Sequence, residues 1–162
     1  MKFISCILLC ALSFVSFSQN KGIEVFENLV GSEWISEGLQ LGGFEGKTVH
    51  DIEWGLNGKI VKVKTYTTDP KTKEFSLRNE GIRTFNSQTD QLEFYEFDKL
   101  GGVTSGSITA DGSNIYFEYV YEGLTLRDSW IYQTKDEYQL IVGIWKDGKW
   151  TKKFHEATFI RK

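Results

Sequence analysis

The chain is poor in cysteine, proline and histidine, and each shortage narrows what the protein can be. Both cysteines, Cys6 and Cys10, precede residue 19, so residues 19–162 can form no disulfide and offer no thiolate for catalysis. The single proline is Pro70, which leaves the rest of the chain free to form regular strands. There are two histidines, His50 and His155, and neither has an evident carboxylate partner by spacing.

The charge balance excludes further classes of protein. Lysine and arginine number 19 and aspartate and glutamate 22, which gives a net charge of −3. A nucleic acid or an anionic membrane surface would require a basic patch, so we expect neither as a partner. Aromatic residues, by contrast, make up 15% of the chain, which is typical of strands rather than of a disordered segment.

The first 18 residues, "MKFISCILLCALSFVSFS", have the pattern of an export signal. Lys2 precedes an apolar run that ends near Val15, and the run is too short to span a bilayer. Ser16 and Ser18 are small residues at the positions that a signal peptidase reads. We expect cleavage after Ser18, which would change the net charge from −3 to −4 because Lys2 is removed.

The expected product is an exported protein, periplasmic or extracellular, with one domain over residues 19–162 and no membrane span. A lipid-anchored cysteine is the alternative. Against it, Leu9 rather than a small residue precedes Cys10, and only five residues precede Cys6.

Ten short segments with alternating hydrophobic and polar residues follow one another after the signal, separated by turn signals. The expected strands are 32–38, 47–55, 59–69, 74–85, 91–98, 102–110, 114–123, 124–134, 137–145 and 149–162. Asn57-Gly58, Asp111-Gly112 and Asp147-Gly148 predict tight hairpins, because these pairs accept the positive φ of such turns.

Consecutive hairpins predict an all-β fold, a closed antiparallel up-and-down barrel of about ten strands. A twisted sheet of this size closes on itself and thereby removes its exposed edges. A short helical turn before the first strand would bury Ile23, Phe26 and Leu29 as a plug. A two-sheet sandwich is the alternative, but the long crossover connections of that fold are missing.

Several short motifs resemble those of known barrels. "NLVGSEWISEG" resembles the opening of calycin-type barrels, although its Gly31 and Trp34 are one residue further apart than usual. "LTLRDSWIYQTKDEYQL", "GKW" and the terminal "TFIRK" are similar to an uncharacterised family of secreted bacterial lipocalin-like proteins. This resemblance implies a barrel that is plugged at one end and holds a small apolar molecule. It also implies that Arg161 packs over Trp34 to close that end.

The chain more distantly resembles barrels of the nitrobindin and fatty-acid-binding-protein type. Nitrobindins bind haem through a histidine on the last strand, and His155 lies six residues before Arg161. Their Gly-x-Tyr-Pro-Thr segment has no counterpart here. The resemblance therefore raises haem or metal binding by His155 as an alternative, whereas no cofactor is expected otherwise. A solvent-exposed or hydrogen-bonded strand histidine is the simpler interpretation of His155.

We predict a ligand site on the inner surface of the barrel. Its candidate residues are Trp34, Tyr95, Phe117, Tyr119, Arg127, Trp130 and His155. Arg127 is the preferred interior charge, since a guanidinium suits a carboxylate head group. The aromatic residues can equally be plain core. For Arg78, Glu80, Arg83, Glu118, Arg127 and Asp128 as a set, the simpler interpretation is that most lie on the solvated outer face.

The expected function is to bind a small hydrophobic or amphipathic molecule, without a catalytic site. The alternatives are the haem barrel and an interaction module packed solid with side chains. An acid–base activity in the barrel mouth is a further alternative that would require two carboxylates to converge.

Overall fold

The structure is a computed structural model that describes residues 22–40 and 42–162. The expected export signal and its cleavage site lie outside these residues. The 3-10 turn η1 (Ile23–Phe26) precedes ten strands. The strands are β1 (Ser32–Gln40), β2 (Phe44–Gly55), β3 (Ile60–Thr68), β4 (Phe75–Asn86), β5 (Gln91–Asp98), β6 (Val103–Asp111), β7 (Asn114–Tyr121), β8 (Leu124–Thr134), β9 (Glu137–Lys146) and β10 (Lys149–Arg161).

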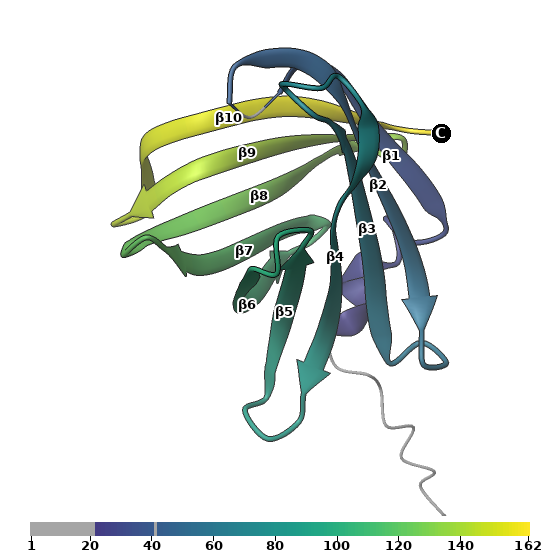
Figure 1. The fold of residues 1–162 in the computed structure, drawn as a ribbon. Helices are drawn as coiled ribbons and strands as arrows, with labels where there is room; N and C mark the ends of the chain where they lie inside the picture. Colours follow the sequence, from purple (N-terminus) through teal and green to yellow (C-terminus); the bar gives the residue numbers. More distant parts are fainter. Residues whose placement is uncertain (1–21, 41) are drawn as a thin grey trace, which may run out of the picture.

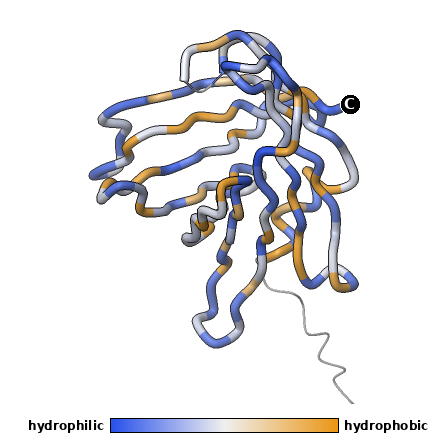
Figure 2. The backbone as a smooth tube through the Cα atoms, viewed as in Figure 1, coloured by the Kyte–Doolittle hydropathy of each residue, from blue (hydrophilic) through white to orange (hydrophobic). Residues whose placement is uncertain are grey.

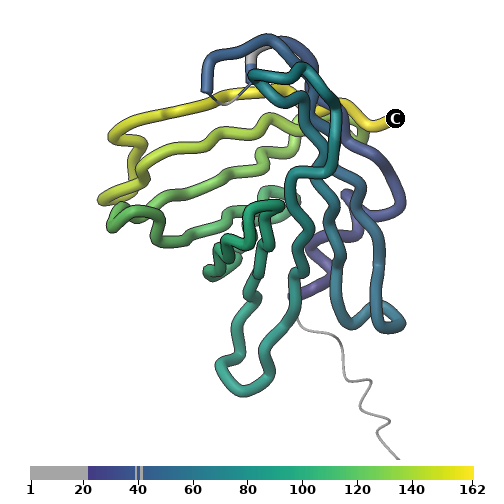
Figure 3. The backbone as a smooth tube through the Cα atoms, viewed as in Figure 1, coloured from purple at the N-terminus to yellow at the C-terminus, as the bar shows by residue number. Residues whose placement is uncertain are grey.

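The ten strands form a closed antiparallel barrel in which each strand pairs with its neighbours in sequence (Figure 1). Figure 3 follows the chain once around this barrel, until yellow β10 returns to β1. The predicted fold is therefore confirmed. The closing seam is short, because β1 and β10 pair only through Trp34 with Arg161 and Ile35 with Ile160. The described part of the chain contains no helix with the length and hydrophobicity that a transmembrane span requires.

The tight turns contain residues that accept the positive φ such turns require. Asn57 and Gly58 have φ of 55° and 79°, and Asp147 and Gly148 have φ of 51° and 74°. Asp147 and Gly148 form a two-residue turn between the paired Lys146 and Lys149, as in the mirror-image turns that match the twist of a hairpin. The β2–β3 turn is longer: four residues separate the paired Gly55 and Ile60, and Leu56 also has a positive φ of 48°.

The hydrophobic core occupies one half of the barrel, which we call the closed end. Ile23, Phe26 and Leu29 from the segment around η1 are each 2% exposed there, as the sequence predicts. They pack with inward-facing residues such as Ile115 and Phe159. Figure 2 shows hydrophobic and hydrophilic residues alternating along the strands, so that one face of each strand supplies this core.

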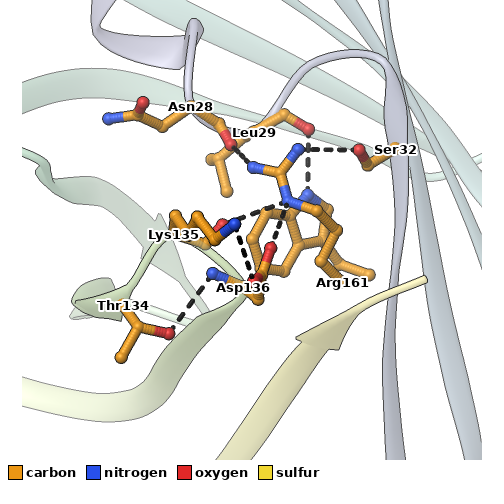
Figure 4. A network of polar contacts seen from close by, with 8 residues as sticks. Asn28, Leu29, Ser32, Thr134, Lys135, Asp136 and Arg161 are labelled. Carbon is orange, nitrogen blue, oxygen red and sulfur yellow. Dashed lines mark hydrogen bonds and ion pairs between the residues drawn. The ribbon is translucent and has the colours of Figure 1, made fainter.

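Arg161 packs over Trp34 at the closed end. Figure 4 shows Arg161 there among Asn28, Ser32, Lys135 and Asp136. The guanidinium carbon of Arg161 lies 4.7 Å from the Trp34 ring centroid. Arg161 also donates hydrogen bonds to Ser32 Oγ (2.8 Å), to the Lys135 carbonyl (3.0 Å) and to the Asn28 carbonyl. One side chain therefore ties β10 to β1, to the β8–β9 turn and to the segment after η1.

Candidate functional site

A cavity of about 710 Å³ lies in the other half of the barrel, which we call the open end. It is bounded by inward-facing residues near the loops that follow β1, β3, β5 and β7, such as Gln40, Thr67, Asp98 and Tyr121. The residues of η1 fill only the closed end. At the open end no such segment of the described chain enters the barrel, and a space remains between the side chains.

The wall formed by β8, β9 and β10 is largely apolar. Leu126, Trp130, Leu140, Val142 and Phe159 line the cavity there. Their inward positions follow from the period of two along each strand. This wall offers an apolar surface to a bound molecule.

The wall formed by β1, β2 and β3 carries hydroxyl and amide groups instead. Thr48 Oγ1 donates to Gln40 Oε1 at 2.6 Å, and it lies 3.1 Å from Thr67 Oγ1. Gln40 in turn donates to the Gly38 and Gly46 carbonyls. The two walls together make the cavity amphipathic.

An ion pair bridges β4 and β5 inside the barrel. Arg83 Nη2 donates to Glu96 Oε1, while Asn79 Nδ2 donates to Glu96 Oε2. Arg83 is only 7% exposed, and its guanidinium carbon lies 5.9 Å from the Phe94 ring centroid and 5.5 Å from that of Phe117. Glu96 therefore neutralises a cation that is enclosed by aromatic rings.

Asp128 is a second interior carboxyl group. It lies on β8 opposite Phe117 of β7 and Val142 of β9, and its Oδ1 accepts a hydrogen bond from Tyr119 at 3.0 Å. Burial, with a smaller effect from the charge of Glu96, raises the pKa of Asp128 to about 7. The same burial and the neighbouring Asp128 raise the pKa of the Tyr119 hydroxyl.

His50 lines the cavity from β2 and packs against two aromatic rings. Its ring centroid lies 5.1 Å from that of Trp130 and 4.8 Å from that of Phe159. Nδ1 lies 3.0 Å from Thr65 Oγ1, whereas Nε2 is buried without a hydrogen-bond partner among the described residues. Burial, aided by the charge of Arg83, lowers the pKa of His50 to about 3, so the imidazole is neutral.

His155 also lines the cavity and is half-buried. Desolvation lowers the pKa of its imidazole. It lies after an irregularity in the β9–β10 pairing between Lys153 and His155. From His155 to Arg161 the strand has no further irregularity. Residues two apart therefore share a face, and the inward face of Arg161 predicts an inward His155.

The sequence-predicted site residues divide into three groups. Phe117, Tyr119, Trp130 and His155 line the cavity. Trp34 is fully buried at the closed end, where its indole nitrogen donates to the Leu29 carbonyl at 2.9 Å. Tyr95 and Arg127 do not line the cavity.

The prediction that Tyr95 faces inward is wrong. Phe94 and Glu96, its neighbours on β5, line the cavity, so the alternation places Tyr95 on the outer face. Its hydroxyl donates to Glu93 Oε2 at 2.9 Å, a contact along the outer surface.

The interior position expected of Arg127 also needs correction. Arg127 pairs with Glu118 on the outer face and lies 4.3 Å from the Trp145 ring centroid, while Asp128 points inward. A carboxyl group can be buried as the neutral acid, whereas a guanidinium keeps its charge at any ordinary pH. Of two adjacent charged residues, Asp128 is therefore the one that can face the cavity without a counter-charge.

The site predicted from the sequence leaves out several polar residues that line the cavity. Among them are His50, Arg83, Glu96 and Asp128. The only signal that could have found His50 is its period-two relation to Ile52, which belongs to the core. Glu96 has the same relation to the core residue Phe94, but its pairing with Arg83 depends on the register between β4 and β5.

The described residues include no group of three or more histidine, cysteine, aspartate or glutamate side chains arranged to hold a metal ion. No family model matches the chain, and no curated protein matches it either.

Proposed function

We propose that the barrel binds a small hydrophobic or amphipathic molecule in the cavity at its open end. The observation that carries the proposal is a space of about 710 Å³ with one apolar wall and a few oriented polar groups. Small-molecule sites are typically concave, roughly 300–1,000 Å³ in volume, and lined mainly by apolar side chains.

The cavity also favours binding over a purely structural role. Protein interiors are close-packed, and voids larger than a water molecule are few. An interaction module packed solid with side chains would fill the open end as Ile115 and Phe26 fill the closed end. The expected export places this binding in the periplasm or outside the cell.

A catalytic role has less support. Glu96 and Asp128 both line the cavity, and the charge of Glu96 contributes to the raised pKa of Asp128. Both oxygens of Glu96 are hydrogen-bonded, to Arg83 and Asn79. The two carboxyls therefore do not form a pair free to exchange protons with a substrate.

Filling the cavity tests the proposal. We expect N-phenylnaphthylamine, a neutral fluorescent probe, to bind the parent protein saturably. Leu126→Trp should abolish this binding, because Leu126 lines the cavity. Ile160→Trp is the matched control, since Ile160 lies outside the cavity and is 47% exposed. Absence of saturable binding by the folded parent protein would refute the proposal.

Haem binding through His155 is a second candidate, favoured by the position of this half-buried imidazole at the cavity. His155 would supply the axial nitrogen ligand to the iron. It ranks second because no described residue hydrogen-bonds His155, whereas ligating histidines are usually oriented by such a bond. Visible absorbance after incubation with haemin, lost in His155→Ala, would support it.

A further inference from the structure

We propose that the ligand is an amphiphile with a cationic head, and that the Asp128 carboxylate binds this head. The inference rests on the proposed binding function and specifies its ligand class. Four observations support it: the charge of the cavity lining, the engagement of Arg83, the free oxygen of Asp128 and the aromatic rings around it.

The lining of the cavity carries more acidic than basic side chains. The basic ones are Arg78 and Arg83, and the acidic ones are Glu96, Asp98, Glu122 and Asp128. An anionic ligand would therefore enter a space whose formal charge is already negative. A cation is the complementary charge.

Arg83 is the obvious rival, because an arginine inside a barrel can hold an anionic head. Its Nη2 is already engaged by Glu96. Its Nε and Nη1 have no hydrogen-bond partner, but both atoms are buried, with the rings of Phe94 and Phe117 beside the guanidinium. A ligand would reach these two buried nitrogens only if the side chains around them moved, so Arg83 acts as the internal counter-ion of Glu96.

Asp128 differs from Arg83 because its unengaged atom is not among the buried ones. Oδ1 accepts the Tyr119 hydroxyl, and Oδ2 accepts no hydrogen bond from any described residue. No cationic side chain pairs with Asp128 among the described residues. A carboxylate buried without a counter-charge is costly, and a cationic ligand would supply that charge.

The surroundings of Asp128 suit a cation as well. Phe117 lies directly opposite on β7, and Trp130 is two residues further along the same face of β8. Tyr119 adds a third ring at hydrogen-bond distance. Aromatic faces attract ammonium groups, and more strongly where water is excluded. The apolar wall around Leu126 and Val142 would hold the hydrocarbon part.

Proton release gives a second readout. The groups that act on Asp128 are Tyr119 on β7, Glu96 on β5 and Arg83 on β4, and no titratable residue faces it from the paired position Val142 on β9. Burial keeps much of the carboxyl protonated near neutral pH. Binding a cation requires the ionised form, so each amine bound near pH 7 should release a fraction of a proton.

The experiment compares decylamine, decanol and decanoate, which share a chain and differ in the head. Affinities are measured by titration calorimetry below the micelle concentrations, at about pH 8. We expect decylamine to bind at least about tenfold more tightly than decanol, with decanoate weakest. Asp128→Asn should remove the preference for the amine and leave decanol binding unchanged, which also shows that the variant is folded.

Asp90→Asn is the matched control, because it removes the same charge from the β4–β5 turn at the closed end. It should keep the full preference for the amine. If decanoate binds as tightly as decylamine, or if Asp128→Asn keeps the preference, the cationic head is refuted while the binding function stands. If none of the three compounds binds, the binding function itself fails.

Discussion

His50 and Asp128 are two titratable residues of the cavity lining whose pKa values shift in opposite directions for the same reason. Burial disfavours the charged form, so it lowers the pKa of His50 from 6.5 to about 3 and raises that of Asp128 from 3.8 to about 7. For His50, the stabilising contribution is lost as the pH falls from 6.5 towards about 3. For Asp128, it is present below pH 3.8 and is lost as the pH rises through about 7.

Asp128→Asn separates the pH-dependent contribution of Asp128 to stability from that of His50, because it leaves His50 unchanged. We expect this variant to gain stability relative to the parent protein as the pH rises from about 4 to about 7. Each pKa unit of the shift corresponds to ~1.4 kcal/mol. Urea unfolding of both proteins over this range measures the difference, and a difference that does not vary with pH would contradict a buried, protonated Asp128.

Gly81 makes room for the ion pair between Arg83 and Glu96. A Cβ at this position would lie 2.6 Å from both Arg83 Nη1 and Glu96 Cδ. Gly81→Ala should therefore destabilise the protein by ~1–3 kcal/mol, the usual cost of overpacking. Gly55→Ala is the control, since its Cβ would meet Ile60 Cγ1 and Lys62 Cε at 2.9–3.0 Å and would introduce a similar overlap away from the ion pair. Equal losses of unfolding free energy in the two variants would argue against this role of Gly81.

Among the elements, the seam between β1 and β10 is the weakest connection of the barrel. Only two residue pairs form the ladder there, Lys162 N donates one further backbone hydrogen bond to the Glu33 carbonyl, and the Arg161 side chain adds hydrogen bonds across the closed end. Every other pair of neighbouring strands is joined through six or more residue pairs. The seam therefore depends more on the Arg161 side chain than any other strand pair depends on a single side chain.

Arg161→Ala should open this seam. We expect a loss on the order of 2–3 kcal/mol, because hydrogen bonds of a charged donor are lost, and faster hydrogen exchange at Ile35 and Ile160. Arg127→Ala on the outer face is the matched control. Its pair with Glu118 is partly exposed and should contribute no more than about 1 kcal/mol. Unchanged exchange at the seam in Arg161→Ala would refute the role of Arg161.

The strands could be predicted from sequence, but the inward faces could be predicted only in part. All ten strands follow from local alternation and from turn residues such as Asn57-Gly58, which act over a few positions. In "LTLRDSW", Asp128 shares a face with Leu126 and Trp130, so alternation alone favours Asp128 over Arg127 as the interior residue. The partners of the two charges, Glu118 for Arg127 and Tyr119 for Asp128, both lie on β7 and depend on the β7–β8 register, which local alternation does not give.

At the scale of the whole molecule, the barrel is filled at one end and hollow at the other. The segment around η1 inserts Ile23, Phe26 and Leu29 into the closed end, whereas the cavity of about 710 Å³ occupies the open end. Sequence predicts the plug from three apolar residues. It does not predict the cavity, because the volume depends on side chains from nearly all of the strands at once.

Native mass spectrometry tests the central claim, that this cavity holds a small molecule. The protein is expressed from its full sequence in a bacterium and purified without detergent. We predict a reproducible added mass that identifies the ligand and is absent in Leu126→Trp. A bare protein mass that persists after incubation with a lipid extract, with decylamine and with haemin would contradict the account.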